Sequence, residues 1–134
     1  MDKWGVTQAL LETSPGPEQI LGEDGVALCK AQNDLICETL QKYPGRFLGS
    51  ATLPVGDVEA ACEELERCVK ELGFVSWHTH SNYGDTWIDD EQCRPILKKA
   101  AELGVYVYLY PTMPTTPAST SGAGSSPRRA SALP

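Results

Sequence analysis

The chain contains two histidines, His78 and His80, and their spacing makes them the first candidates for chemistry. Alternate residues of a β-strand point to the same side, so two imidazoles at this spacing can face one ligand. Zinc takes three protein ligands in catalytic sites and four in structural sites, so the pair alone is too small a donor set. Asp85 offers a carboxylate, but the pattern does not fix its position. Two interpretations stay open: metal binding, or a polar loop entrance with one imidazole hydrogen-bonded into the fold.

Both histidines follow one of four short apolar runs that predict β-strands, and each run gives way to a polar loop. The runs are Val6–Leu11, Arg46–Leu53, Phe74–Trp77 and Val105–Tyr110. Loops at the carboxyl ends of parallel strands carry the chemistry in α/β folds. We therefore expect the site among the residues that follow these runs, at Glu12–Pro17, Thr52–Pro54, His78–Asp85 and Tyr110–Pro114.

Three helices are predicted between these strands. The second helix begins after Asp57, a good N-cap, and stops at Gly73. The third begins at Asp89 or Asp90 and stops at Gly104. The first covers Asp24–Lys42, and its predicted buried face follows helical spacing with one polar exception: Leu28, Gln32, Leu35, Ile36, Leu40 and Tyr43.

A repeated motif sets the fold class. Glu71-Leu72-Gly73-Phe74-Val75 recurs 31 residues later as Glu102-Leu103-Gly104-Val105-Tyr106, as expected for consecutive βα units. Right-handed crossovers make such strands parallel. The strand Val105–Tyr110 is apolar or aromatic on both faces, which is typical of a parallel strand covered on both sides. The sequence predicts an α/β fold of four parallel strands and three helices: half of a (β/α)8 barrel, or a small doubly wound sheet.

Composition narrows the class of protein. The 134 residues carry 18 acidic and 11 basic side chains, a formal charge of −7 without a basic stripe, which argues against nucleic acid as a partner. No run of 18 apolar residues predicts a membrane span, and the start Met1-Asp2-Lys3-Trp4 does not resemble a secretory signal. Five cysteines without a C-x-x-C pair fit a reducing cytoplasm, and on helical apolar faces they are interpreted as structural.

The composition changes sharply at Pro114. Residues 115–134 are rich in Ser, Thr, Ala, Gly and Pro, and their only charges are Arg128 and Arg129. The charge thus divides into −9 for residues 1–114 and +2 for the tail. Such a tail has too little apolar surface to offset the entropy of ordering. We expect one domain over residues 1–114 and a disordered low-complexity tail over residues 115–134.

Residues 1–114 resemble the amidohydrolase-related metal-dependent enzymes, which include aminocarboxymuconate-semialdehyde decarboxylase and the resorcylate decarboxylases. The stretches that carry the resemblance keep their order and spacing over about 85% of the chain. They include Tyr43-Pro44-Gly45-Arg46-Phe47, Ala51-Thr52-Leu53-Pro54, Glu64-Leu65-Glu66-Arg67-Cys68, His80-Ser81-Asn82-Tyr83-Gly84 and Tyr108-Leu109-Tyr110-Pro111-Thr112. The resemblance implies a (β/α)8 barrel that uses zinc, or sometimes manganese, for nonoxidative decarboxylation or hydrolysis of a small, aromatic carboxylate.

Carried over residue by residue, the family's metal site is mostly missing. Its first-strand His-x-His pair would precede Met1, and its late aspartate would follow Pro134. Tyr110 stands where the family usually has a metal-binding histidine, and a phenol with a pKa near 10 is a poor substitute for imidazole. No metal ligand is therefore assigned in this chain. His78 stands where the family often has asparagine.

The remaining site residues lie in the loop after the third predicted strand. The resemblance matches His80 to a histidine of the family's active-site mouth, so it is the candidate catalytic residue. Asn82, Tyr83 and Asp85 are the candidate substrate contacts; the alternative is that they only shape the loop.

Two functional hypotheses follow. In the first, the chain is a piece of a metal-dependent carboxy-lyase or hydrolase, truncated at both ends and without turnover or stoichiometric metal by itself. In the second, it is a non-catalytic half-barrel that associates with itself or a partner, because its first and last strands have unpaired edges. A small flavodoxin-like binding domain is less favoured, since no phosphate-binding loop accompanies the strands.

Overall fold

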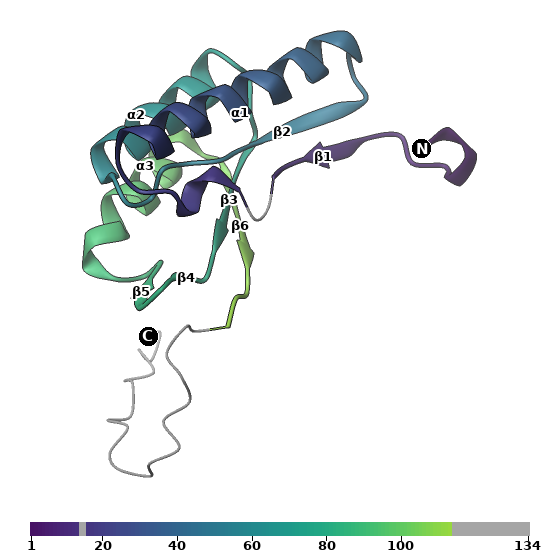
Figure 1. Cartoon of the computed structure of the whole chain (residues 1–134). Helices are drawn as coiled ribbons and strands as arrows, with labels where there is room; N and C mark the ends of the chain where they lie inside the picture. Colours follow the sequence, from purple (N-terminus) through teal and green to yellow (C-terminus); the bar gives the residue numbers. More distant parts are fainter. Residues whose placement is uncertain (14–15, 114–134) are drawn as a thin grey trace.

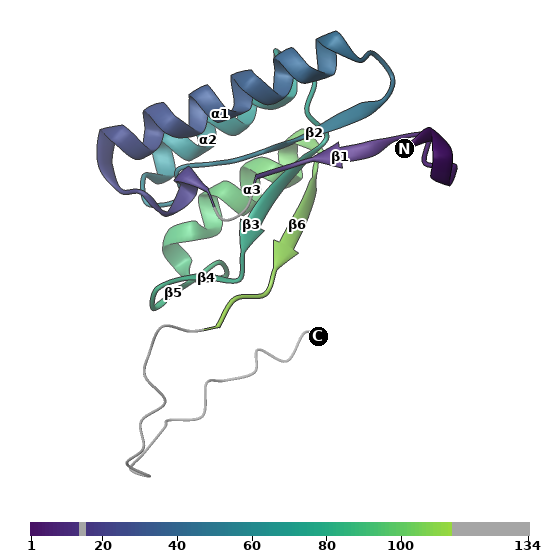
Figure 2. The ribbon, with the colours of Figure 1, turned by 45° about the vertical axis from the view of Figure 1, so that its right-hand side comes forward.

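The computed structural model describes residues 1–13 and 16–113. Four strands form a parallel sheet in the order β1-β2-β3-β6, which is also their order along the chain. Figures 1 and 2 show the three helices together on one side of this sheet. The strands are β1 (Ala9–Leu11), β2 (Phe47–Ala51), β3 (Ser76–His80) and β6 (Tyr106–Tyr110), and the helices are α1 (Gly22–Lys42), α2 (Val58–Lys70) and α3 (Arg94–Leu103).

This topology confirms four parallel strands and three helices and decides between the two expected architectures. A doubly wound sheet reverses its strand order and places helices on both faces. Here the order never reverses and the helices cover one face, as in half of a (β/α)8 barrel. The predictions for the tail concern residues 115–134, which lie outside the described residues.

The start of α2 and the end of α3 match their sequence signals, whereas α2 ends at Lys70, ahead of the predicted stop at Gly73. Asp57 caps α2, because its Oδ1 accepts the backbone N–H of Ala60 at 3.1 Å. Gly104 ends α3 in the left-handed conformation, with φ of +68°, and its N–H satisfies carbonyls of the last turn. The faces that these two helices bury form the core with Trp77 of β3: Ala61, Leu65, Cys68, Ile96 and Ala100. The third helix starts differently from the prediction, since a 3-10 turn, Glu91–Cys93, precedes it and Asp90 accepts the N–H of Trp87 instead.

The predicted buried face of α1 is right at Ile36 and Leu40 and wrong at Leu28 and Leu35. Leu28 and Leu35 are 46% and 56% exposed, whereas α1 buries Gly25, Cys29, Asn33 and Ile36. The physical reason is the amide of Asn33. Its Nδ2 donates to the carbonyl of Thr52 at 2.9 Å, and its Oδ1 accepts the Thr52 N–H at 2.9 Å. A buried amide that is fully hydrogen-bonded replaces an apolar residue in the stripe, and apolar periodicity cannot detect it.

The expectation of cover on both faces of the last strand is also wrong. β6 pairs with β3 along its whole length, from Ser76–Tyr106 to His80–Tyr110, but it forms the edge of the sheet. All five of its residues are exposed, and Tyr106 reaches 79%. Apolar character on both faces shows that a strand can be buried on both sides, but not whether the described residues supply the cover.

The polar loop predicted at Ser81–Thr86 contains a small hairpin. Its strands, β4 (Asn82–Tyr83) and β5 (Thr86–Trp87), pair antiparallel next to the end of β3. Of the helices in the part of the chain that the structure describes, none is both long and apolar enough to cross a membrane. All five cysteines are free thiols, with Cys29, Cys68 and Cys93 buried.

Candidate functional site

The carboxyl end of β3 gathers the side chains that the sequence singled out. His78 and His80 lie on one face of β3 with their ring centroids 5.7 Å apart, and both are buried. The register pairs His78 with Tyr108 and His80 with Tyr110 of β6. The His80 ring lies 5.8 Å from the Tyr110 ring, and the His78 ring 5.6 Å from the Tyr108 ring. We call these four residues the histidine–tyrosine cluster.

His80 is hydrogen-bonded to a buried carboxylate that the sequence analysis did not identify. Its Nε2 lies 2.9 Å from Oε1 of Glu18, which belongs to the 3-10 turn Pro17–Gln19 ahead of α1. The same Oε1 accepts the backbone N–H of Gly16 at 2.9 Å. A carboxylate oxygen accepts, so the Nε2–H of His80 is the donor and this bond fixes the orientation of the imidazole. The one available signal was an acidic residue directly after the Gly16-Pro17 turn.

His78 occupies a different environment. Its Nε2 is 3.9 Å from Oε2 of Glu12, beyond hydrogen-bond distance, and it has no hydrogen-bond partner among the described residues. Glu12 follows β1, at a strand end where the sequence predicts chemistry. Both histidines therefore face carboxylates from the segment after β1, but only His80 forms a close pair.

Tyr83 supports His80 from the hairpin. Its hydroxyl oxygen accepts the backbone N–H of His80 at 3.2 Å and lies 3.0 Å from the hydroxyl of Thr79. Burial raises the pKa of Tyr83 above its ordinary value, so the phenol stays protonated at neutral pH. Tyr83 is thus a neutral hydrogen-bonding group beside the imidazole of His80, with ring centroids 5.6 Å apart.

Asn82 connects the hairpin to the segment after β6. Thr112 donates its hydroxyl to Asn82 Oδ1 at 2.7 Å, and Asn82 Nδ2 donates to the carbonyl of Gly84 at 3.1 Å. The backbone N–H of Thr112 also binds the hydroxyl of Ser81 at 2.9 Å. These bonds fix the turn after β3 against the segment that follows β6.

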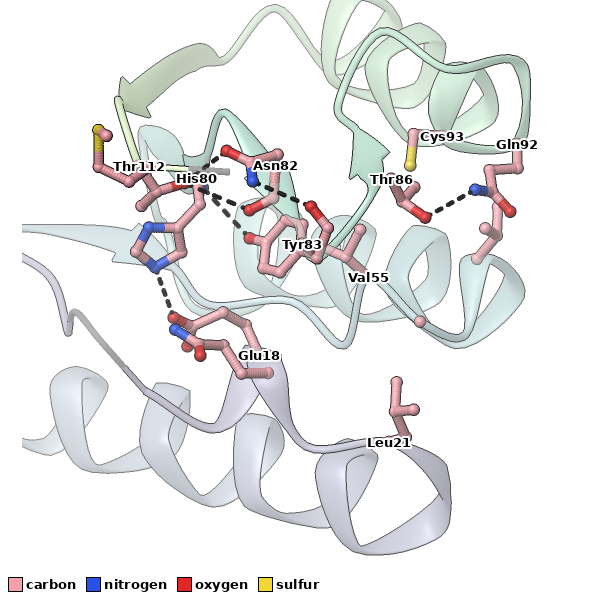
Figure 3. A pocket seen from close by; sticks show the side chains of 15 residues that line it. Glu18, Leu21, Val55, His80, Asn82, Tyr83, Thr86, Gln92, Cys93 and Thr112 are labelled. Atoms are coloured by element: carbon pink, nitrogen blue, oxygen red, sulfur yellow. Dashed lines mark hydrogen bonds and ion pairs between the residues drawn. The ribbon is translucent and has the colours of Figure 1, made fainter. Parts of the chain in front are cut away.

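A pocket of about 600 Å³ opens beside these residues, and we call it the rim pocket. Figure 3 shows Glu18 and Leu21 on one side of it, facing Tyr83, Asn82 and Val55 on the other. The predicted residues that line it are His80, Asn82 and Tyr83. Asp85 is exposed on the turn between β4 and β5 and does not line the rim pocket; its predicted role in substrate contact stays a prediction.

Cys93 also lines the rim pocket, but it is not a strong nucleophile. Burial raises the pKa of its thiol, and the nearby Asp90 and Asp89 raise it further. A thiol whose pKa is raised holds its proton at neutral pH, and the thiolate is the reactive form. Cys93 therefore acts as a small apolar wall, in keeping with the structural interpretation of the cysteines.

The described residues do not fit a resident metal ion. They contain no group of three or more His, Cys, Asp or Glu side chains placed to hold one. Nε2 of His80 is already bonded to Glu18. The ring beside the two imidazoles is that of Tyr110, a half-exposed phenol. A protonated phenol is a poor ligand beside two imidazoles.

Comparison with known proteins gives one consistent result. The model of the amidohydrolase family matches residues 19–133. Gamma-resorcylate decarboxylase from Rhizobium sp. is 34% identical over 122 residues, which cover 85% of this chain and 37% of that enzyme. The chain therefore spans less than two fifths of the length of this relative.

Solved structures agree with the sequence match. The crystal structure of 2,6-dihydroxybenzoate decarboxylase from Rhizobium has a TM-score of 0.80 at 34% identity, covering 90% of this chain and 40% of that one. A 5-carboxyvanillate decarboxylase from Novosphingobium aromaticivorans, solved with bound manganese, has a TM-score of 0.80 at 31% identity. The matched region covers 85% of this chain and 33% of the chain of that decarboxylase.

Proposed function

The chain belongs to the amidohydrolase family, and on that premise we propose that it forms one side of the mouth of an active site. The reaction is nonoxidative decarboxylation or hydrolysis of a small, aromatic carboxylate, as the names of its relatives suggest. His80 is the proposed catalytic residue, and Asn82 and Tyr83 are the proposed substrate contacts. Their common place on the rim pocket supports these roles.

The observation that carries the proposal is the buried pair of His80 and Glu18. Nonoxidative decarboxylation breaks the bond between a carbon and its carboxylate, releases CO2, and places a proton on that carbon. A site for it needs a group that holds and moves a proton. An imidazole whose Nε2 is bonded to a buried carboxylate at 2.9 Å is such a group, because the carboxylate orients the ring and fixes which nitrogen holds the proton.

A binding experiment tests whether the chain forms one side of an active-site mouth. The ¹⁵N-labelled chain is titrated with 2,6-dihydroxybenzoate and followed by NMR. The amide signals of His80, Asn82 and Tyr83 are expected to shift, and His80→Gln should weaken binding at least about fivefold, since one hydrogen bond to a charged ligand is lost. Lys98→Ala, an exposed change on α3, should bind as the wild type does. Unchanged affinity in His80→Gln would contradict the role of His80.

We further propose that these 134 residues hold no stoichiometric metal and do not turn over by themselves. The expected result is an empty chain after equilibration with Mn²⁺ or Zn²⁺ and no CO2 release. Tyr110→His is the informative variant, because the rings of His78, His80 and Tyr110 are 5.7, 5.8 and 6.3 Å apart. A third imidazole there should give tighter Zn²⁺ binding than the wild type. Tightly bound metal with decarboxylation by the wild-type chain would overturn this proposal.

The second candidate function is self-association without catalysis. It is favoured by β6, an exposed and entirely apolar or aromatic edge strand with no described residue pairing its outer edge. Such edges pair readily with other chains. Analytical ultracentrifugation tests it: a dimer that Val107→Lys converts to monomer supports pairing through β6, and a wild-type monomer at all concentrations contradicts it.

A further inference from the structure

The rim pocket has two chemically different ends. Figure 3 shows His80 and Thr112 at one end and Leu21 and Cys93 at the other. The first end carries an imidazole and a hydroxyl, and both of these groups form hydrogen bonds. Three apolar side chains line the opposite end, which we call the aliphatic end: Leu21, Val55 and Cys93.

The described residues give a charged group no cationic partner at the aliphatic end. Among them, no lysine or arginine lines the rim pocket. The polar side chains on that side, Thr86 and Gln92, are hydrogen-bonded to each other at 3.2 Å. The thiol of Cys93 is neutral, because burial raises its pKa. This end can therefore take an uncharged group, whereas a charge buried there without a partner would cost free energy.

Leu21 closes the aliphatic end against the backbone of Gly56. A Cβ added to Gly56 would lie only 2.6 Å from Cδ2 of Leu21, so the segment ahead of α1 touches the segment ahead of α2 at this point. Leu21 is 76% exposed. An alkyl group bound in the rim pocket would cover part of this side chain, and removing apolar surface of both partners from water favours binding.

We infer that the aliphatic end is a subsite for an uncharged alkyl substituent of the ligand and that Leu21 is a specificity-determining residue. This inference rests on the proposed function, in which His80 meets the carboxylate and the body of the ligand extends along the rim pocket. The volume of about 600 Å³ is that of a small-molecule site and leaves room for the substituent. The preferred ligand class is thus an aromatic monocarboxylate that carries an alkyl chain.

Three ligands test the inference by calorimetry on the 134-residue chain. They are benzoate, para-butylbenzoate, and the analogue of para-butylbenzoate in which a second carboxylate replaces the terminal methyl group. The butyl chain should raise affinity at least about tenfold over benzoate, since several methylene groups leave water. The dicarboxylate should bind no more tightly than benzoate. Equal affinity for benzoate and para-butylbenzoate, or a dicarboxylate that binds as tightly as para-butylbenzoate, overturns the inference.

Substitutions of Leu21 locate the subsite. Leu21→Ser should remove most of the difference in affinity between para-butylbenzoate and benzoate, and Leu21→Met, which keeps an apolar side chain, should retain it. Leu35→Ser is the matched control, because Leu35 is also an exposed leucine and does not line the rim pocket. A butyl preference that survives Leu21→Ser, or that Leu35→Ser reduces equally, would mean that the chain binds elsewhere, and the inference would fail.

The outcomes separate this inference from the proposed function. If benzoate shifts the amide signals of His80, Asn82 and Tyr83 and the butyl chain adds no affinity, the proposed mouth stands and the alkyl subsite is refuted. If para-butylbenzoate binds in a manner that depends on Leu21 but not on His80, as His80→Gln would show, the alkyl subsite is supported and the role of His80 is contradicted. If none of the three ligands binds, both proposals fail.

Discussion

Two buried glutamates in this chain have opposite surroundings. Glu64 on α2 is 1% exposed, and both of its oxygens are bonded: Oε1 accepts from Asn33 at 2.8 Å and from Arg67 at 2.7 Å, and Oε2 accepts from Arg67 at 2.9 Å. Glu18 at the rim pocket is nearly as buried, yet its Oε2 has no partner among the described residues. Each site contains a buried carboxylate, and the two differ in how many carboxylate oxygens accept a hydrogen bond from the described residues.

The difference separates a carboxylate that joins two helices from one that orients a histidine. A buried carboxylate costs free energy unless donors satisfy its oxygens. Around Glu64 the donors come from α1 and α2 themselves, so this carboxylate joins the two helices. Glu18 instead uses one oxygen, Oε1, to hold the imidazole of His80 beside the rim pocket. The first carboxylate joins two helices, and the second positions a side chain of the candidate site.

Loss of Glu64 is expected to have the largest effect. Glu64→Ala removes the shared acceptor of Asn33 and Arg67, and breaking a buried ion pair in this way should lower the free energy of unfolding by about 3 kcal/mol. Urea denaturation measures it. Glu66→Ala on the same helix, whose partners Lys70 and Lys99 are at the surface, should cost less than about 1 kcal/mol. Equal losses in the two variants would refute the contrast.

The sequence predicted the scaffold better than the site, for a physical reason. Strands, helices and their stops depend on local periodicity and on residues such as Asp57 and Gly104, which act within one turn. The pairing of His80 with Glu18 joins residues 62 positions apart and depends on how the chain folds back. Neither a histidine nor a glutamate in the sequence predicts this pairing. His80, Asn82 and Tyr83 could be proposed from the sequence because the resemblance matches His80 and because all three follow one predicted strand, where topology concentrates polar groups.

Asn33 tests the same contrast with a smaller effect. Asn33→Ala leaves the backbone N–H and carbonyl of Thr52 without their partners and removes one donor from Oε1 of Glu64, so it should cost about 2 kcal/mol of unfolding free energy. Leu35→Ala, on the exposed face that apolar periodicity assigns to the core, should change stability by less than about 0.5 kcal/mol. A larger loss for Leu35→Ala would mean that the apolar stripe, not the amide, anchors α1.

The smallest expected effect concerns the thiol of Cys29, whose pKa depends on the charges of both glutamates. Burial raises the pKa of its thiol from 9.0 to about 12, and the charges of Glu18 and then Glu64 add to the rise. The folded chain therefore holds this proton more tightly than the unfolded chain. That part of the stability is complete below pH 9 and is lost as pH rises from 9 toward 12.

The free energy of unfolding should fall less steeply above pH 9 in Cys29→Ala than in the wild type or in Cys37→Ala. In Glu18→Gln the fall should also be shallower, because removal of that charge brings the folded pKa of Cys29 closer to its unfolded value, and the change should exceed that in Glu64→Gln. A larger change in Glu64→Gln than in Glu18→Gln would mean that the charge of Glu64 contributes more than that of Glu18 to the raised pKa of Cys29.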